Sequence, residues 1–352
     1  MASIPHRAQP RSLIRQLATP LYLPTIFTGA KSFANNPVIG NPLLNRLGLH
    51  SGRMLLAGGM AELRRAPLAL AIDAEDKAAF RRDGFLVKED FLPGEHFERL
   101  EDEVRSYRAP GWECHQGDTI THRIHLDHGA LAQLPATRAL LRLPAYRRPL
   151  AWAGAHAGAP VFYIQRIFNH LTEGAADPQR HLHTDTFHPT VKAWLFLDDV
   201  DERKGPFTYV PGSHRLTRAW LRAQYRRSLQ SRSDPIRYSA RGSLRWREEE
   251  LPELGLPAPR RFAVPRNTLV IADTSGIHRR GEASEAGSRL EIWAFSRPSP
   301  FLPVTLPDLP PLTRLRDRAL RAWLERQDMR ARRAGRLASW RAVGPERVEE
   351  LQ

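Results

Sequence analysis

The sequence predicts an all-β core, a barrel or sandwich of antiparallel strands, with helices flanking it. Between residues 161 and 295 the chain has short apolar runs rich in Val, Ile, Phe and Trp, separated by Gly, Pro, Asp and Ser. This is the pattern of strands joined by turns. On either side of this stretch, apolar residues recur at helical spacing. Together these observations favour strands in the middle of the chain and helices around them.

Each element can be placed in order along the chain. A helix is expected over residues 77–82, ended by Gly84, followed by a strand at 85–87 and a helix that Pro93 starts. The strands of the core are expected at 161–168, 191–197, 207–210, 268–271 and 290–295.

The chain is predicted to form one large domain with an extension at each end. The expected boundaries are a basic, partly apolar extension at 1–74, a folded domain at 75–305 with an insert at about 216–259, and a basic helix at 306–352. The first extension is expected to be irregular, either a strap packed on the core or a patch lying on an anionic membrane. The insert is polar and rich in arginine, which favours a lid or an excursion from the domain over a part of the sheet.

The helix expected after Pro311 has an apolar stripe on one side and arginines over much of the rest. The stripe comprises Leu312, Leu315, Ala319, Ala322 and Trp323. We expect this stripe to dock the helix on the barrel; the alternative is an arm that binds nucleic acid or lipid.

The overall charge and the single cysteine restrict the class of protein. A formal net charge of +15 and a pI near 10.8 suit anionic partners. Cys114 has no second cysteine to pair with, which favours a reducing compartment. Prolines interrupt the apolar stretch that follows the first arginines, so it is a poor signal peptide, and no segment has the roughly 20 apolar residues of a membrane span. We expect a cytoplasmic protein, with peripheral membrane contact as a further expectation.

The residues that suggest chemistry are two histidines and an aspartate. On an extended strand, His183 and Asp185 point to one face, and His278 follows a distant strand and a short turn. Two histidines and one carboxylate on one side of iron(II) leave positions open for a co-substrate and O2. His125 and Asp127 have the same spacing as the first pair but lack the following pattern, and are expected at the surface or behind the site. A pair of His181 with His183 is the less favoured alternative, because it would leave Asp185 without a role.

The order of these residues, with the segments 193–194, 197–200 and 204–214 between them and Arg289 after them, resembles the phytanoyl-CoA dioxygenase family of Fe(II)/2-oxoglutarate-dependent oxygenases. The resemblance covers roughly residues 76–300. It implies a double-stranded β-helix, or jelly roll, that uses iron(II), 2-oxoglutarate and O2.

The resemblance also implies roles for single residues. His183, Asp185 and His278 would hold the iron, and Arg289 would pair with the far carboxylate of 2-oxoglutarate, which suits the guanidinium fork. Three further positions are expected near the co-substrate or the substrate: Asn169 and Trp194 toward 2-oxoglutarate, and Gln165 toward the substrate. One position departs from the family, because Arg280 stands where relatives often have a small hydroxyl residue, and it is expected to meet an anionic substrate.

The resulting expectation is a dioxygenase that hydroxylates a C–H bond of an anionic small-molecule or lipid-linked substrate, with an octulosonic acid (Kdo) sugar of lipopolysaccharide as the candidate. An acyl-CoA hydroxylase of the phytanoyl-CoA type is the first alternative. A non-catalytic basic binding protein on the same fold is the second, since fold alone does not fix function. Nucleic acid is not expected as a partner.

Overall fold

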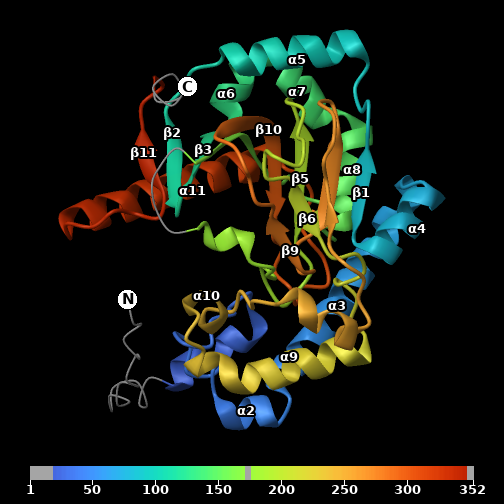
Figure 1. Ribbon diagram of the computed structural model, residues 1–352, viewed down its shortest axis with the longest axis vertical. Helices are drawn as coiled ribbons and strands as arrows, with labels where there is room; N and C mark the ends of the chain where they lie inside the picture. The colour runs from blue at the N-terminus through green and yellow to red at the C-terminus, as the bar shows by residue number, and fades with distance from the viewer. Residues whose placement is uncertain (1–18, 171–175, 347–352) are drawn as a thin grey trace.

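Two antiparallel sheets form the centre of the protein (Figure 1), which is described here from a computed structural model covering residues 19–170 and 176–346. The larger sheet has the strand order β1-β8-β5-β10-β4-β3-β2-β11, and the smaller has the order β7-β6-β9. The sheets pack on each other through aromatic side chains, with the rings of Trp194 and Phe207 4.4 Å apart. The predicted fold class, an all-β core of the jelly-roll type with flanking helices, is confirmed; the sheets do not close into a barrel.

The strands and helices have these bounds. The strands are β1 (Phe85–Lys88), β2 (Gly111–Gln116), β3 (Thr119–His125), β4 (Val161–Asn169), β5 (Val191–Phe196), β6 (Phe207–Tyr209), β7 (Arg260–Arg261), β8 (Leu269–Asp273), β9 (His278–Arg280), β10 (Gly287–Ser296) and β11 (Arg341–Val343). The α-helices are α2 (Pro42–Arg46), α3 (Leu49–Leu68), α4 (Ala74–Asp83), α5 (Gly94–Ser106), α6 (His128–Gln133), α7 (Pro135–Arg142), α8 (Pro144–Ala153), α9 (Arg218–Gln230), α10 (Arg237–Ala240) and α11 (Pro310–Arg333).

The five predicted core strands correspond to β4, β5, β6, β8 and β10. The short helix before the first strand is also present as α4, and Gly84 ends it in the left-handed conformation at φ +86°, with its N–H bonded to the carbonyl of Phe80. Glycine adopts this conformation without the steric cost that a Cβ would add. The local signals at this end of the domain therefore agree with the fold.

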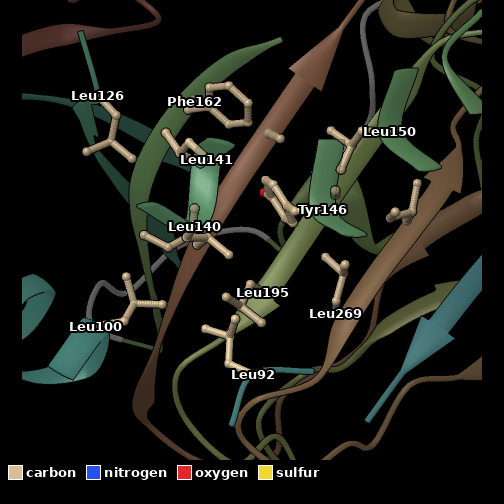
Figure 2. Close-up of a cluster of buried hydrophobic side chains, with 14 of the residues drawn as sticks. Leu92, Leu100, Leu126, Leu140, Leu141, Tyr146, Leu150, Phe162, Leu195 and Leu269 are labelled. Atoms are coloured by element: carbon tan, nitrogen blue, oxygen red, sulfur yellow. The ribbon is translucent and has the colours of Figure 1, made fainter. Parts of the chain in front are cut away.

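Helices α5 to α8 cover one face of the larger sheet and form the main apolar core with it (Figures 1 and 2). Tyr146 and Leu150 of α8 pack there with Leu195 of β5 and Leu269 of β8, and all four side chains are at most 2% exposed. Burial of this face leaves the opposite face of the same sheet to turn toward the smaller sheet. The cavity described below lies on that opposite face.

The described part of the N-terminal extension is largely helical, so the prediction of an irregular segment is wrong there. The long helix α3 buries Arg53, Arg64 and Arg65, whose guanidinium groups donate to backbone carbonyls such as those of Ile26 and Ala153. A buried guanidinium is tolerated when carbonyls satisfy its donors. The first arginines of the sequence, Arg7, Arg11 and Arg15, lie outside the described residues.

The predicted insert packs on this N-terminal region, with α9 lying against α2 and α3 at one end of the molecule (Figure 1). A second apolar cluster joins the two segments, including Met54 and Ala57 of α3 with Trp220 of α9 and Trp246. The insert is therefore anchored by a core of its own. Whether it acts as a lid, and where the domain boundaries fall, stay predictions.

Helix α11 docks on the domain, but the predicted stripe does not dock it. Leu312, Leu315 and Trp323 are 43%, 64% and 55% exposed. The buried side chains of this helix are instead Asp317, Leu324 and Asp328. The docking relies largely on polar contacts, such as the ion pair of Arg321 with Asp127 and the bonds from Arg316 to the carbonyls of Ala159 and Pro160. Periodicity of apolar residues could not reveal a face that docks through charge.

Among the described residues, no helix has the length and apolar character needed to cross a membrane.

Candidate metal centre and cavity

The backbone brings the two predicted halves of the metal centre together. His183 and His278 pair in an antiparallel bridge, in which the N–H of His183 donates to the carbonyl of His278 at 2.8 Å and the reverse bond is 2.9 Å. Two residues further on, the N–H of Asp185 donates to the carbonyl of Thr274 at 3.0 Å. The segment 183–185 thus extends the smaller sheet beside β9. Its period-two alternation places the imidazole and the carboxylate on one side.

His183, Asp185 and His278 each offer one ligand atom, and these atoms all lie within 4.8 Å of one another. The Nε2 atom of His183 is 4.0 Å from Oδ1 of Asp185, and Nε2 of His278 is 3.8 Å from Oδ2. Both histidines are almost fully buried, at 2% and 3% exposure. A compact group of two imidazoles and one carboxylate fits the facial site of a non-haem iron(II) enzyme.

The hydrogen bonds of the two imidazoles determine which nitrogen faces the cluster. Nδ1 of His183 lies 2.8 Å from the carbonyl of His181, and Nδ1 of His278 lies 3.0 Å from the carbonyl of Gly276. A carbonyl can only accept, so both Nδ1 atoms carry the proton and both Nε2 atoms keep a free lone pair. Among the described residues, the buried Nε2 of His278 has no hydrogen-bond partner. An unsatisfied buried nitrogen aimed at a carboxylate is explained by a metal ion between them.

Electrostatics keep the three side chains in the protonation states that a metal requires. Burial lowers the pKa of His278 to about 4 and holds that of His183 well below its usual range. Burial alone would raise the pKa of Asp185, but the nearby positive charges, chiefly Lys192, hold it well below its ordinary value. At neutral pH the cluster therefore consists of two neutral imidazoles and a carboxylate, as ligation requires.

Lys192 is a member of the site that the sequence did not indicate. Its Nζ lies 2.6 Å from Oδ2 of Asp185, and burial lowers its pKa. It precedes Trp194 by two positions on β5, so both side chains point to the same face of the strand. The sequence predicts that Trp194 faces the co-substrate. Because residues two apart on a strand share a face, the same prediction could have been extended to Lys192.

The cluster opens into a cavity of about 430 Å³ between the two sheets. Four of the other residues predicted for the site line it, namely Gln165, Trp194, Arg280 and Arg289. Asn169 does not line it; its side chain is buried and its amide lies 3.3 Å from the carbonyl of Lys204.

Arg289 is buried on β10 and is held by fixed groups. Its Nη1 donates to the carbonyl of Lys204 at 3.2 Å and to that of Gly205, while its Nε lies 3.5 Å from Oε2 of Glu291. Burial raises the pKa of Glu291, with Arg289 opposing that effect. The guanidinium is thus oriented by the turn at Lys204 and Gly205 and by a carboxylate on its own strand.

Gln165 and Arg280 are both engaged with other side chains. The Gln165 amide donates to Glu291, and its oxygen accepts from Nε of Arg123 at 2.6 Å. Arg280 forms an ion pair with the buried Asp177 at 2.5 Å, so much of its charge is neutralised within the protein.

The competing histidines lie elsewhere. His125 belongs to strand β3, stacks near Tyr163 at 5.1 Å and lies 3.7 Å from Asp317 of α11, so the expectation of a surface position is wrong for it. Asp127 caps helix α6 instead of facing His125. His181 contributes its carbonyl to His183, and its side chain is exposed. Within the described chain, the one metal-type cluster is therefore the predicted one.

Comparison with known proteins gives a family match. Residues 80–244 match the family model described as phytanoyl-CoA dioxygenase (PhyH), which confirms the predicted resemblance. The matched region contains His183 and Asp185 and ends before His278 and Arg289. No curated protein matches the chain by sequence.

Three solved structures illustrate the similarity in shape. One is described as the non-heme alpha ketoglutarate dependent epimerase SnoN from nogalamycin biosynthesis, with 17% identity, coverage of 63% of this chain and 80% of that chain, and a TM-score of 0.40. HygX from Streptomyces hygroscopicus, with nickel and 2-oxoglutarate bound, has 19% identity, 64% and 86% coverage and a TM-score of 0.39. AviO1 from Streptomyces viridochromogenes has 17% identity, 64% and 95% coverage and a TM-score of 0.37.

Proposed function

We propose that this protein is an Fe(II)- and 2-oxoglutarate-dependent dioxygenase that hydroxylates a C–H bond of an anionic small molecule, a proposal supported by the match of residues 80–244 to the phytanoyl-CoA dioxygenase family model. The observation that carries the proposal is the buried group of His183, Asp185 and His278, whose ligand atoms lie within 4.8 Å of one another. The group borders the same cavity as Arg289, so metal and co-substrate can be held side by side.

Each residue then has a defined task. His183, Asp185 and His278 hold the iron, with the carbonyls of His181 and Gly276 keeping both imidazoles in the tautomer that presents Nε2. Arg289 binds the far carboxylate of 2-oxoglutarate through its guanidinium fork. When bound, iron and 2-oxoglutarate supply the oxidising power, by which O2 is consumed and 2-oxoglutarate becomes succinate and CO2.

The surrounding side chains orient the reactants and limit water. Trp194 and Phe207 place two tilted rings, with centroids 4.4 Å apart, in the wall of the cavity. Such a wall lowers the local dielectric, which strengthens the interaction of Arg289 with a carboxylate. Gln165 is fixed between Arg123 and Glu291, so it presents a rigid polar group.

An anionic substrate is supported by the charges around the cavity. Its lining includes one carboxylate, Asp185, and a larger number of cations. The cations are Arg123, Lys192, Arg237, Arg241, Arg279, Arg280 and Arg289. A lipid-linked acidic sugar, such as a Kdo-type sugar acid, is our first candidate, and an acyl-CoA is the second.

The proposal is tested on the wild-type protein prepared without oxygen. Adding iron(II) and 2-oxoglutarate should produce the weak visible metal-to-ligand charge-transfer band, and admitting O2 should then yield succinate. Screening sugar acids and acyl thioesters for faster succinate formation separates the two substrate candidates. If the wild type binds neither iron(II) nor 2-oxoglutarate, the protein is not an oxygenase and the non-catalytic alternative replaces it.

We also propose that the protein contacts anionic membranes, through the outward face of α3. Leu55, Leu56 and Leu63 of this helix are 52%, 45% and 54% exposed, and Leu70 just after it is 92% exposed. Glycines and alanines lie between them on the same face, at positions 52, 59 and 66. An apolar helix face on a protein of net charge +15 suits the boundary of an anionic bilayer.

Cosedimentation with vesicles tests this contact. The wild type should pellet with phosphatidylglycerol vesicles and much less with phosphatidylcholine vesicles, and the Leu56→Gln/Leu63→Gln double variant should pellet several-fold less. Leu315→Gln on α11 is the matched control, because that leucine is 64% exposed on a different helix. Equal loss in the control, or no binding by the wild type, would refute the contact.

A further inference from the structure

We infer that Arg123 is a second anion-binding residue of the cavity, which takes a carboxylate or phosphate group of the substrate while Arg289 takes the co-substrate. The inference rests on the proposed function only in treating this cavity as the substrate site. Arg123 lies on β3, at a position that the sequence did not single out, and its side chain lines the cavity together with the metal cluster.

Aromatic rings surround the Arg123 guanidinium. Its central carbon lies 3.8 Å from the ring centre of Trp293, 4.6 Å from that of Trp340 and 5.4 Å from that of Tyr163. The ring faces stabilise the cation but do not neutralise it. They also fix the plane of the guanidinium, so that less side-chain entropy is lost when an anion binds.

Arg123 differs from the other buried or half-buried cations of the cavity in having no carboxylate partner among the described residues. Lys192 pairs with Asp185, Arg280 with Asp177 and Arg279 with Glu248. Arg289 lies against Glu291.

No ion pair joins Arg123 to an acidic side chain of the described chain; its one hydrogen bond there runs from Nε to Gln165. Burial lowers its pKa to about 10, so it still carries its charge at neutral pH. A half-buried, charged guanidinium without a counter-ion among the described residues is stabilised by an anionic ligand.

The polar contacts on the sheet also define where the anion would lie. Arg123 of β3 stands opposite Gln165 of β4, which stands opposite Glu291 of β10, two positions from Arg289. Two strand spacings separate β3 from β10, about 10 Å. Because Nε is directed to Gln165, the terminal nitrogens remain for a ligand. The two guanidinium groups, on strands that are not neighbours, can therefore hold two anions at the same time.

Part of this subsite comes from the C-terminal segment. Strand β11 pairs with β2, and Arg341 forms an ion pair with the buried Glu113 at 2.6 Å. This pairing positions the preceding residue, Trp340, against Arg123, and both Ser339 and Trp340 line the cavity. The C-terminal segment is thus a wall of the proposed substrate subsite.

Calorimetric titration of the full-length protein tests the inference with two probes, glucuronate for a carboxylate and glucose 1-phosphate for a phosphate. Titrations are made with and without Mn(II) and 2-oxoglutarate, which fill the co-substrate site. We expect Arg123→Met to raise the Kd of the preferred probe at least about tenfold, since a charge-assisted fork is lost. Arg123→Lys should bind with intermediate affinity, and the preferred probe identifies the anionic group.

Arg260→Met is the matched control, because Arg260 also lies over aromatic rings, 5.2 Å from Phe85 and Phe262, but does not line the cavity. It should bind the probe like the wild type. Trp340→Ala, which keeps the Arg123 charge, should weaken binding several-fold and serves if Arg123→Met does not fold. The inference is wrong if the wild type binds neither probe, if Arg123→Met binds as tightly as the wild type, or if Arg260→Met weakens binding equally.

Failure of the proposed function is recognised separately. The Kd of 2-oxoglutarate itself should stay within about twofold in Arg123→Met, because Arg289 is untouched. A wild type that binds a probe but not 2-oxoglutarate would contradict the dioxygenase and leave the anion subsite standing.

Discussion

Replacing Asp185 by alanine is expected to reduce iron(II) affinity by at least about a hundredfold and to abolish succinate formation. The substitution removes the one carboxylate among the three proposed ligands. It also leaves Lys192, now 2.6 Å from that carboxylate, as an uncompensated positive charge beside the metal position. Two neutral imidazoles would then be the only ligands left, and the ammonium group of Lys192 would repel a divalent cation. Iron content after desalting and the charge-transfer band measure the loss, and His183→Ala should behave in the same way.

Asp127→Ala provides a matched control. His125 and Asp127 repeat the spacing of His183 and Asp185, but Asp127 caps α6 and pairs with Arg321. This variant should keep full iron binding and lose only some stability, about 0.5–2 kcal/mol for the cap. Retention of iron by Asp185→Ala together with its loss in Asp127→Ala would move the metal centre to the other histidine cluster.

Replacing Arg289 by methionine is expected to raise the Kd of 2-oxoglutarate by about tenfold to a hundredfold, the effect of removing a hydrogen bond to a charged group. Iron binding should change little, because Arg289 is not among the proposed ligands. Arg289→Lys should recover part of the affinity, since a lysine supplies the charge but not the fork. Titrating 2-oxoglutarate against the charge-transfer band of the iron-loaded protein measures the Kd of 2-oxoglutarate for each variant. The iron content after desalting measures iron binding.

The same substitution leaves Glu291 buried without its nearest cation, so a structural effect must be separated from a binding effect. Arg289→Met/Glu291→Gln removes that unpaired charge and should recover thermal stability without recovering 2-oxoglutarate affinity. Arg203→Met, at an exposed turn, controls for the loss of one positive charge. An unchanged Kd for 2-oxoglutarate in Arg289→Met would exclude this arginine as the anchor.

Much of the sheet could be predicted from the sequence, because its central strands are buried and therefore apolar. Strands β2 and β3 could not, since residues such as Thr121 and Arg123 face a polar cavity and break the apolar pattern. Because β3 was not recognised as a strand, Arg123 could not be predicted as a residue of the site. The segment from His183 to Asp185 was recognisable because the alternation of an extended strand requires only two residues to fix a common direction.

The ends of the chain show where such reasoning fails. The arginines of α3 are satisfied by carbonyls that come from distant segments, such as Ala155 and Leu302 for Arg64. Helix α11 docks through charged side chains, while its apolar stripe stays exposed. Both depend on partners far away in sequence, which no local pattern contains. The roles of the site residues and the domain boundaries stay predictions.

The strand order of the larger sheet also has a consequence for how the chain matures during synthesis. Strand β10 stands between β4 and β5 although it follows them by about a hundred residues, and β11 completes the edge beyond β2. During translation, β4 and β5 therefore emerge well before their shared neighbour and expose unpaired backbone edges, which favour aggregation. The candidate metal group is likewise incomplete until His278 has been synthesised, 95 residues after His183. We expect iron to be acquired only after nearly the whole chain has left the ribosome, so that truncated products cannot sequester the metal.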